Sequence, residues 1–168
     1  KWDKLDMAIL SFQSFQLNFP TSKYINDINY YLSVAYFKEG DWELALEHIQ
    51  EYLNDLGTKS SELTAEAYYI LALSSFNLND YESALKTFEL VTKNFPGQTA
   101  MNYSSEIGIA KSLSHLGKKE EAIKKFQSLI SQYPKTETAQ EASSWLGDYY
   151  LENNDFENAI FYYQYFVT

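Results

Sequence analysis

Cysteine and arginine are both absent from this chain of 168 residues. The lack of cysteine excludes disulfide bonds, thiol catalysis and thiolate metal ligands. All 13 basic residues are lysines, so the chain lacks the planar group with which arginine grips carboxylates and phosphates at two points. Anion binding through arginine is therefore excluded.

Proline and glycine are scarce, at 3 and 6 residues, which excludes collagen-like and disordered compositions. No apolar run approaches the roughly 20 residues of a membrane-spanning helix. The net charge of −10 repels phosphate backbones and anionic lipids, so we expect neither nucleic acid nor direct bilayer insertion by this segment. Apolar residues make up 45% of the chain, enough for a folded core, and a protein partner with a basic face is favoured.

An internal repeat sets the expected architecture. An alanine recurs in similar surroundings every 37 to 39 residues, at Ala8, Ala45, Ala84, Ala122 and Ala159. Four residues later comes an aromatic residue or isoleucine, at Phe12, Ile49, Phe88, Phe126 and Tyr163. A spacing of four places both residues on one helical face. The period therefore predicts stacked helical units rather than a single globular core.

Turn signals divide each unit into two helices. They precede the repeated alanine at Gly40-Asp41, Asn79-Asp80, Gly117-Lys118 and Asn154-Asp155. Glycine or asparagine accepts the left-handed conformation that ends a helix, and aspartate caps the next one. We expect the first helix of each pair to begin near Ser22, Ser60, Thr99 or Thr136, each of which is a candidate N-cap. Apolar residues then recur at spacings of three and four, as in a helix.

These patterns resemble the tetratricopeptide repeat, whose motif is Leu-Gly-x2-Tyr in the first helix and Ala-x3-Phe in the second. The last unit reads Leu146-Gly147-x2-Tyr150 and then Ala159-x3-Tyr163. The resemblance implies an all-α fold, a right-handed superhelical solenoid of about four and a half helical hairpins. We expect one solenoid domain over residues 1–168, with units at about 1–20, 21–57, 58–96, 97–134 and 135–168, within a longer protein.

In the tetratricopeptide family, residues two before and two after the motif leucine, and one turn further on, line a groove that binds partners. The matching positions with apolar side chains are Tyr30, Val34, Phe37, Tyr69, Leu73 and Phe76. Later units give a more polar wall that includes Lys111, Ser114 and Asp148. The resemblance therefore implies a partner-binding groove for an extended or helical peptide with an apolar end.

Catalysis, metal binding and cofactor binding are not expected. The sequence offers no pairing of a nucleophile with a base and no phosphate-binding glycine pattern. His48 lies three residues from Glu51, but two ligands do not make a metal site. The lysines Lys118, Lys119, Lys124 and Lys125 are interpreted as a solvated helix face, with an acidic docking partner as the alternative.

Within the family, the long first helix and the phrases Phe19-Pro20-Thr21 and Tyr133-Pro134-Lys135-Thr136 resemble bacterial envelope members. These are the BamD-like outer-membrane assembly lipoproteins and the YbgF-like periplasmic proteins of the Tol system. The resemblance implies a non-catalytic scaffold for protein–protein interaction, periplasmic or associated with the outer membrane.

Two alternatives remain, a cytoplasmic adaptor and a structural module that self-associates. The aromatic residues of the last helix suggest self-association through the C-terminal end; they are Phe161, Tyr162, Tyr163, Tyr165 and Phe166. Capping repeats of solenoids are normally polar on their outer face, so this apolar surface needs a cover.

Overall fold

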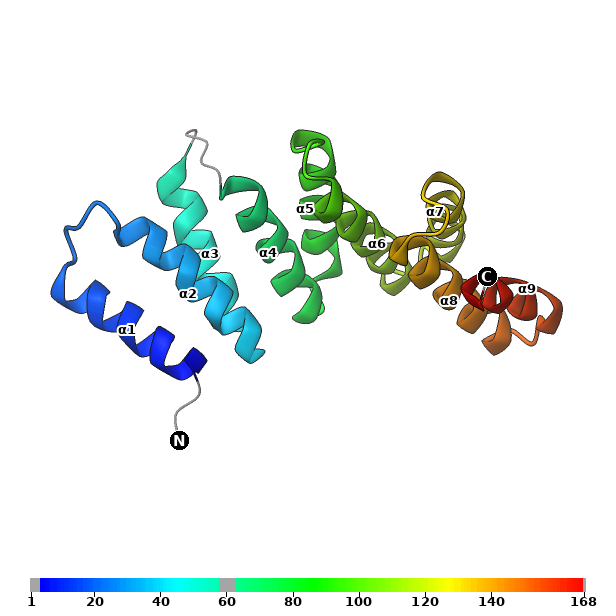
Figure 1. The fold of residues 1–168 in the computed structure, drawn as a ribbon, viewed down its shortest axis with the longest axis horizontal. Helices are drawn as coiled ribbons and strands as arrows, with labels where there is room; N and C mark the ends of the chain where they lie inside the picture. The colour runs from blue at the N-terminus through cyan, green and yellow to red at the C-terminus, as the bar shows by residue number, and fades with distance from the viewer. Residues whose placement is uncertain (1–3, 58–62, 168) are drawn as a thin grey trace. The chain divides into compact units, whose positions relative to one another are not determined.

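The computed structural model describes residues 4–57 and 63–167, which form helices and turns and no strand (Figure 1). The helices are α1 (Lys4–Asn18), α2 (Ile25–Glu39), α3 (Trp42–Leu56), α4 (Thr64–Asn77), α5 (Tyr81–Asn94), α6 (Thr99–His115), α7 (Lys119–Gln132), α8 (Glu137–Glu152) and α9 (Phe156–Val167). The predicted all-α repeat of helical hairpins is confirmed. The repeat expected at about residues 1–20 corresponds to the single helix α1, which carries the repeated alanine Ala8.

The helices form two compact units, one up to Val91 and one from Thr92 onward. In the first unit, α1, α2, α3 and α4 pack one against the next, and the first helices α2 and α4 also touch. In the second unit, α6, α7, α8 and α9 pack in the same way, and α6 touches α8. Each unit therefore contains the repeated arrangement of a hairpin with the first helix of the next hairpin against it.

The turns inside the hairpins follow one geometry. Gly40, Asn79, Gly117 and Asn154 all have left-handed φ values, between 60° and 85°. In each turn the following residue donates its backbone N–H to a carbonyl five residues back, for example Asp41 to Tyr36 and Asp155 to Tyr150. This bond pattern closes a helix when one residue adopts the left-handed conformation. The predicted turns are confirmed, since glycine and asparagine adopt that conformation most easily.

Aspartate caps the second helix in three of the four complete hairpins. Asp41 accepts a hydrogen bond from the N–H of Leu44 at 3.1 Å, and Asp80 and Asp155 accept the equivalent bonds. The third hairpin has Lys118 at this place, and its side chain makes no such bond. The caps satisfy N–H groups that have no partner within the helix.

The N-caps expected for the first helices are confirmed only in part. Thr136 caps α8 through its hydroxyl, which accepts from the N–H of Ala139. The prediction for Ser22 is wrong, because its hydroxyl accepts from the N–H of Tyr24 within a turn and α2 begins only at Ile25. Thr99 is the first residue of α6 rather than its cap. Ser60 lies outside the described residues.

The repeated alanines lie where the helices cross. Ala45, Ala84 and Ala122 have no exposed surface, and the residues four positions later, Ile49 and Phe126 among them, are equally buried. A larger side chain at such a crossing would hold the two backbones apart. The alanine period therefore reports the close contacts that build each unit.

Candidate docking site

Tyr30 is the predicted groove residue that the structure places differently. Its side chain is only 3% exposed and packs in a core cluster with Ile49, Tyr52, Ala67 and Ile70. Burial, followed by a hydrogen bond with Glu66, raises the pKa of Tyr30 well above its usual value. We expected an exposed ring here, but the hydrogen bond allows the polar end of the ring to be buried with the core. Tyr30 therefore belongs to the core beneath the predicted groove and is not one of its exposed residues.

Tyr69 is half-buried and directs its ring toward the second helix of its own hairpin. Its centroid lies 6.1 Å from that of Phe88 in α5. Val34 in α2 and Leu73 in α4 are also half-buried, and Val34 packs against the core cluster that contains Tyr30. Tyr69 and Val34 thus combine core packing with partial exposure, and Leu73 is partly exposed four residues after Tyr69.

Phe37 and Phe76 occupy the same place in successive hairpins, and each is held by an aromatic residue from the second helix. Phe37 meets the edge of Trp42, with ring centroids 5.0 Å apart, and Phe76 meets Tyr81 at 5.2 Å. Both pairs bridge the turn between the helices, and all four residues are half-buried. In the first unit this place is filled by aromatic rings.

The second unit has different residues at this place. Ser114 stands at the position of Phe37 and Phe76, and Lys119 at the position of Trp42 and Tyr81. With no aromatic pair to fill the space, a hollow of about 270 Å³ opens. It is lined by Ser114, Lys119, Trp145, Asp148, Tyr149 and Glu152. We refer to it as the α8 hollow, because four of these residues belong to α8.

The four α8 residues form one stripe. Trp145, Asp148, Tyr149 and Glu152 are spaced by three, one and three, which places them on one side of a helix. The rings of Trp145 and Tyr149 are stacked, with centroids 5.6 Å apart and planes 8° apart. Trp145 also stacks on the buried Phe126 at 4.3 Å, which fixes its orientation. The hollow therefore has a firm aromatic wall and an acidic rim.

Asp148 is oriented by a hydrogen bond from Tyr163 of α9. The hydroxyl of Tyr163 donates a hydrogen bond of 2.6 Å to Oδ1 of Asp148. That hydrogen bond is the main reason why the pKa of Tyr163 is raised, because it favours the protonated phenol. One carboxylate oxygen is thus engaged while Asp148 lines the hollow.

Lys111, the polar residue predicted for the groove, joins the two first helices of the second unit. Its Nζ lies 2.5 Å from Oε1 of Glu141, which links α6 to α8. Lys125 of α7 likewise forms an ion pair with Glu106 of α6. Both lysines therefore bridge neighbouring helices.

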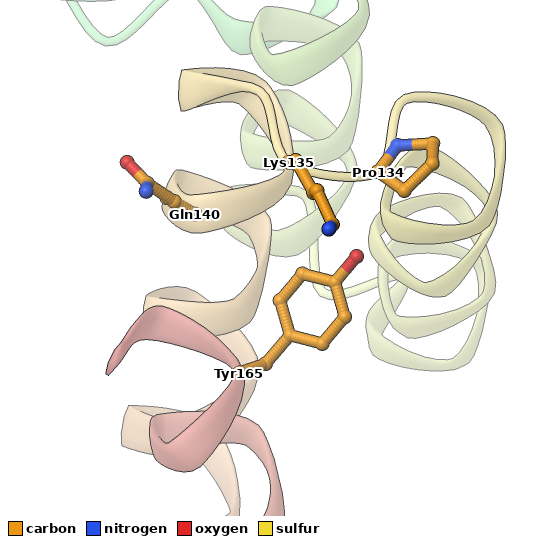
Figure 2. A pocket seen from close by; sticks show the side chains of 4 residues that line it. All are labelled: Pro134, Lys135, Gln140 and Tyr165. Atoms are coloured by element: carbon orange, nitrogen blue, oxygen red, sulfur yellow. The ribbon is translucent and has the colours of Figure 1, made fainter. Parts of the chain in front are cut away.

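A second hollow, of about 350 Å³, lies at the turn before α8 and is lined by Pro134, Lys135, Gln140 and Tyr165. Figure 2 shows the side chains of Lys135 and Tyr165 directed into the same space, while Gln140 points away from it. Pro134, Lys135 and Gln140 are exposed. Exposed polar groups without a fixed partner discriminate weakly among ligands, so the α8 hollow is the better candidate.

His48 makes packing and polar contacts with neighbouring side chains. The ring of His48 stacks on Tyr36 at 5.5 Å, and its Nδ1 lies 3.2 Å from Oδ1 of Asn29 and 3.9 Å from Glu51. Residues 4–57 and 63–167 contain no group of three or more side chains suited to hold a metal ion. Among the described helices none is long and apolar enough to cross a membrane.

Sequence reasoning missed the aromatic half of the α8 hollow. Ser114 and Asp148 were assigned to the polar wall, and Lys119 to a basic cluster, but Trp145, Tyr149 and Glu152 were not singled out. Their helical spacing around Asp148 was the available signal.

Solved structures of helical-repeat proteins share this fold at low identity. The crystal structure of MamA aligns with a TM-score of 0.71 at 18% identity, covering 99% of this chain and 94% of that one. A double mutant of MamA from RS-1 gives 0.74 at 15%, covering 97% and 83%. The C-terminal part of a TPR repeat-containing protein from Cytophaga hutchinsonii gives 0.71 at 17%, covering 96% and 62%. Among curated proteins no sequence matches.

Family models match almost the entire sequence. A tetratricopeptide repeat model matches residues 141–164, which include the α8 hollow's four α8 residues. The model of YfiO, described as outer membrane lipoprotein, matches residues 2–148. Both are families of protein–protein interaction scaffolds that generally lack catalytic activity. With its helical hairpins and this match, the chain belongs to the YfiO family of outer membrane lipoproteins.

Proposed function

We propose that this protein is a non-catalytic scaffold that docks a segment of a partner protein on its first helices, within an assembly of the bacterial envelope. The observation that carries the proposal is the pair of aromatic contacts, Phe37 with Trp42 and Phe76 with Tyr81. They recur at one place in successive hairpins and leave half-buried rings at the surface.

The apolar surface of the first unit is suited to bind apolar side chains of a partner. Val34, Phe37, Leu73 and Phe76 each keep part of their area exposed. Covering such area releases about 25 cal/mol per Å² of apolar surface, so a few side chains supply useful affinity. Because the rings are already held by neighbouring aromatics, little rotamer freedom is lost on binding.

The polar residues of the second unit suit a different part of the partner. Lys111, which is paired with Glu141, and the α8 hollow present charged groups rather than rings. We propose that the second unit binds a polar or charged part of the partner, whereas the first unit binds an apolar part.

The proposed envelope location is supported by the family. Its description as outer membrane lipoprotein supports a periplasmic place or one at the outer membrane, with the cytoplasm as the alternative. Separating membrane, periplasmic and cytoplasmic fractions of the native cells tests this part. Recovery of the native protein in the cytoplasmic fraction alone would reject it.

The docking surface is tested by site-specific photo-crosslinking in the native cells. A photoreactive residue at Leu73 should capture a partner, whereas one at the exposed Lys86 of α5 serves as the matched control. A peptide covering the captured segment is then titrated against Phe76→Ala and Lys86→Ala variants of equal helical content. We expect about a tenfold loss of affinity for Phe76→Ala only, because this variant lacks the aromatic ring that the bound peptide would cover. Equal affinity of both variants would reject the assignment.

Self-association is a second candidate function, and one observation favours it. Phe161 in α9 is 62% exposed at a place where the preceding hairpins carry Glu47, Lys86 and Lys124. Ile160 and Phe156 beside it are also exposed. An aromatic residue at a normally charged position is typical of an interface. Light scattering of the Phe161→Lys variant against the unmodified chain tests whether this surface joins two copies.

A further inference from the structure

We propose that the α8 hollow binds the cationic side chain of a partner segment, and arginine in preference to lysine. This inference rests on the proposed docking function and names the chemistry that the second unit recognises. It follows from the aromatic wall, the charge of the rim and the reason why the hollow exists.

The aromatic wall supplies two stacked rings. Trp145 and Tyr149 lie nearly parallel, and Trp145 is backed by Phe126. A cation within about 6 Å of a ring centroid is attracted by the negative face of the ring, and tryptophan gives the strongest attraction. A planar guanidinium can also stack on such rings, which an ammonium group cannot do.

The rim carries net negative charge. Asp148 and Glu152 contribute two carboxylates, and Lys119 contributes one positive charge. Tyr163 holds Oδ1 of Asp148 by a hydrogen bond of 2.6 Å, so this carboxylate is oriented before a partner arrives. A carboxylate and a guanidinium can form two parallel hydrogen bonds, and this geometry favours arginine.

The size of the hollow fits one side chain. Its volume of about 270 Å³ lies below the roughly 300–1,000 Å³ of sites that enclose small molecules. The hollow is also open to solvent along α8, where Asp148 and Glu152 are exposed. A side chain can therefore enter while the peptide that carries it stays outside.

Two departures from the repeat create the hollow. Ser114 and Lys119 replace the aromatic pairs that fill this place in the first unit. Tyr149 stands where the preceding hairpins have small buried residues, such as Ala35 and Ser112. Because Tyr149 lines the hollow together with Ser114 of α6 and Lys119 of α7, its ring faces the preceding hairpin and borders the space that those two residues leave. The hollow is therefore specific to this hairpin and is not closed by the packing that the other hairpins use.

Lys119 gives the proposal a discriminating test. If the ligand is a cation, Lys119 repels it and its removal strengthens binding. If the hollow instead bound a carboxylate, Lys119 would be its main partner and the same removal would weaken binding. The sign of the Lys119→Ala effect therefore separates the two ligand chemistries.

The experiment follows the indole N–H signal of Trp145 by NMR while blocked pentapeptides are added. The probes are acetyl-Gly-Gly-Arg-Gly-Gly-amide and its lysine and citrulline counterparts, the last being neutral and nearly the same shape. Trp145→Phe assigns the signal. We expect a saturating shift with the arginine peptide, weaker binding of the lysine peptide, and about a tenfold or greater loss with citrulline.

Variants complete the test. Asp148→Asn and Glu152→Gln should each weaken arginine binding, while Lys119→Ala should strengthen it. Glu157→Gln, which removes an exposed carboxylate of α9 outside the hollow, is the matched control and should leave it unchanged. Circular dichroism confirms equal helicity. Equal binding of arginine and citrulline, no saturable shift, or weaker binding by Lys119→Ala would each overturn the proposal.

The outcome is separable from that of the proposed function. Loss of partner binding by Phe76→Ala tests the first unit, whereas the short arginine probe reports on the second unit alone. Arginine binding that persists when crosslinking at Leu73 fails would reject the docking function and keep the hollow's specificity. The reverse result would reject only the specificity.

Discussion

The ring of Tyr163 lies against the backbone of Gly147. A Cβ added to Gly147 would stand 2.5 Å from Cε1, 2.7 Å from Cδ1 and 2.9 Å from Cζ of that ring. The equivalent pairs in the preceding hairpins are Ser33 with Ile49, Ala72 with Phe88 and Ala110 with Phe126. Because Gly147, the glycine of the Leu-Gly-x2-Tyr motif, has no side chain, the ring of Tyr163 can approach its backbone. The hydroxyl of Tyr163 then reaches Asp148.

We therefore expect Gly147→Ala to destabilise the protein by about 1–3 kcal/mol, because the ring must shift in a packed interface. This destabilisation is the net effect, because the cost of moving the ring outweighs the roughly 1 kcal/mol by which alanine stabilises a helix relative to glycine. Thermal unfolding followed by circular dichroism measures the effect. In a Tyr163→Ala background the same change should become neutral or stabilising; a persistent loss there would contradict the explanation.

The aspartate caps should contribute measurably to stability. Asp41→Ala removes the acceptor for the N–H of Leu44, so we expect a loss of about 1 kcal/mol. Lys118→Ala is the matched control at the same place in the third hairpin, where no side-chain cap exists, and should change stability by less than about 0.5 kcal/mol. Urea unfolding compares them, and equal losses would rule out capping as the cause.

The helix crossings should not tolerate a larger residue. Ala122 is fully buried between helices, so Ala122→Leu is expected to cost about 1–3 kcal/mol through overpacking. Lys124→Leu adds an apolar residue at an exposed position of the same helix and should have a small effect. Chemical denaturation measures both. A neutral Ala122→Leu would show that the crossing is looser than its burial indicates.

Alkaline pH should weaken the fold. Burial, with Glu66 as a further cause, raises the pKa of Tyr30, and burial also raises the pKa of Tyr36, Tyr133 and Tyr150. The unfolded chain then loses these protons first, from a pKa near 10.0. The stabilising contribution is complete below that pH and declines as pH rises toward the folded values.

Unfolding free energies measured in urea from about pH 8 to 11 test this dependence. Tyr30→Phe should make the alkaline decline shallower and should lower stability at neutral pH by about 1 kcal/mol, because the hydrogen bond with Glu66 is lost. Tyr24→Phe changes an exposed tyrosine and is the control. An unchanged slope in Tyr30→Phe would contradict the role assigned to this residue.

The sequence by itself determined the helical hairpins and their turns. The alanine period marks the crossings, and the glycine and asparagine residues before each second helix mark the left-handed turns. These features are local, because a residue's conformational preference and a spacing of four act within one helix or turn. The first helices were harder to delimit, since Ser22 caps a turn that lies outside α2.

Tertiary structure alone decided which of the predicted groove side chains are buried and which stay exposed. The sequence pattern assigns Tyr30 and Phe37 to the same groove. In the structure Tyr30 is buried with Glu66 nearby, whereas Phe37 stays half-exposed beside Trp42. The α8 hollow likewise depends on Ser114 and Lys119 leaving space that Trp145 and Tyr149 then border. Such a space is set by side chains from three helices at once, so no single stretch of sequence encodes it.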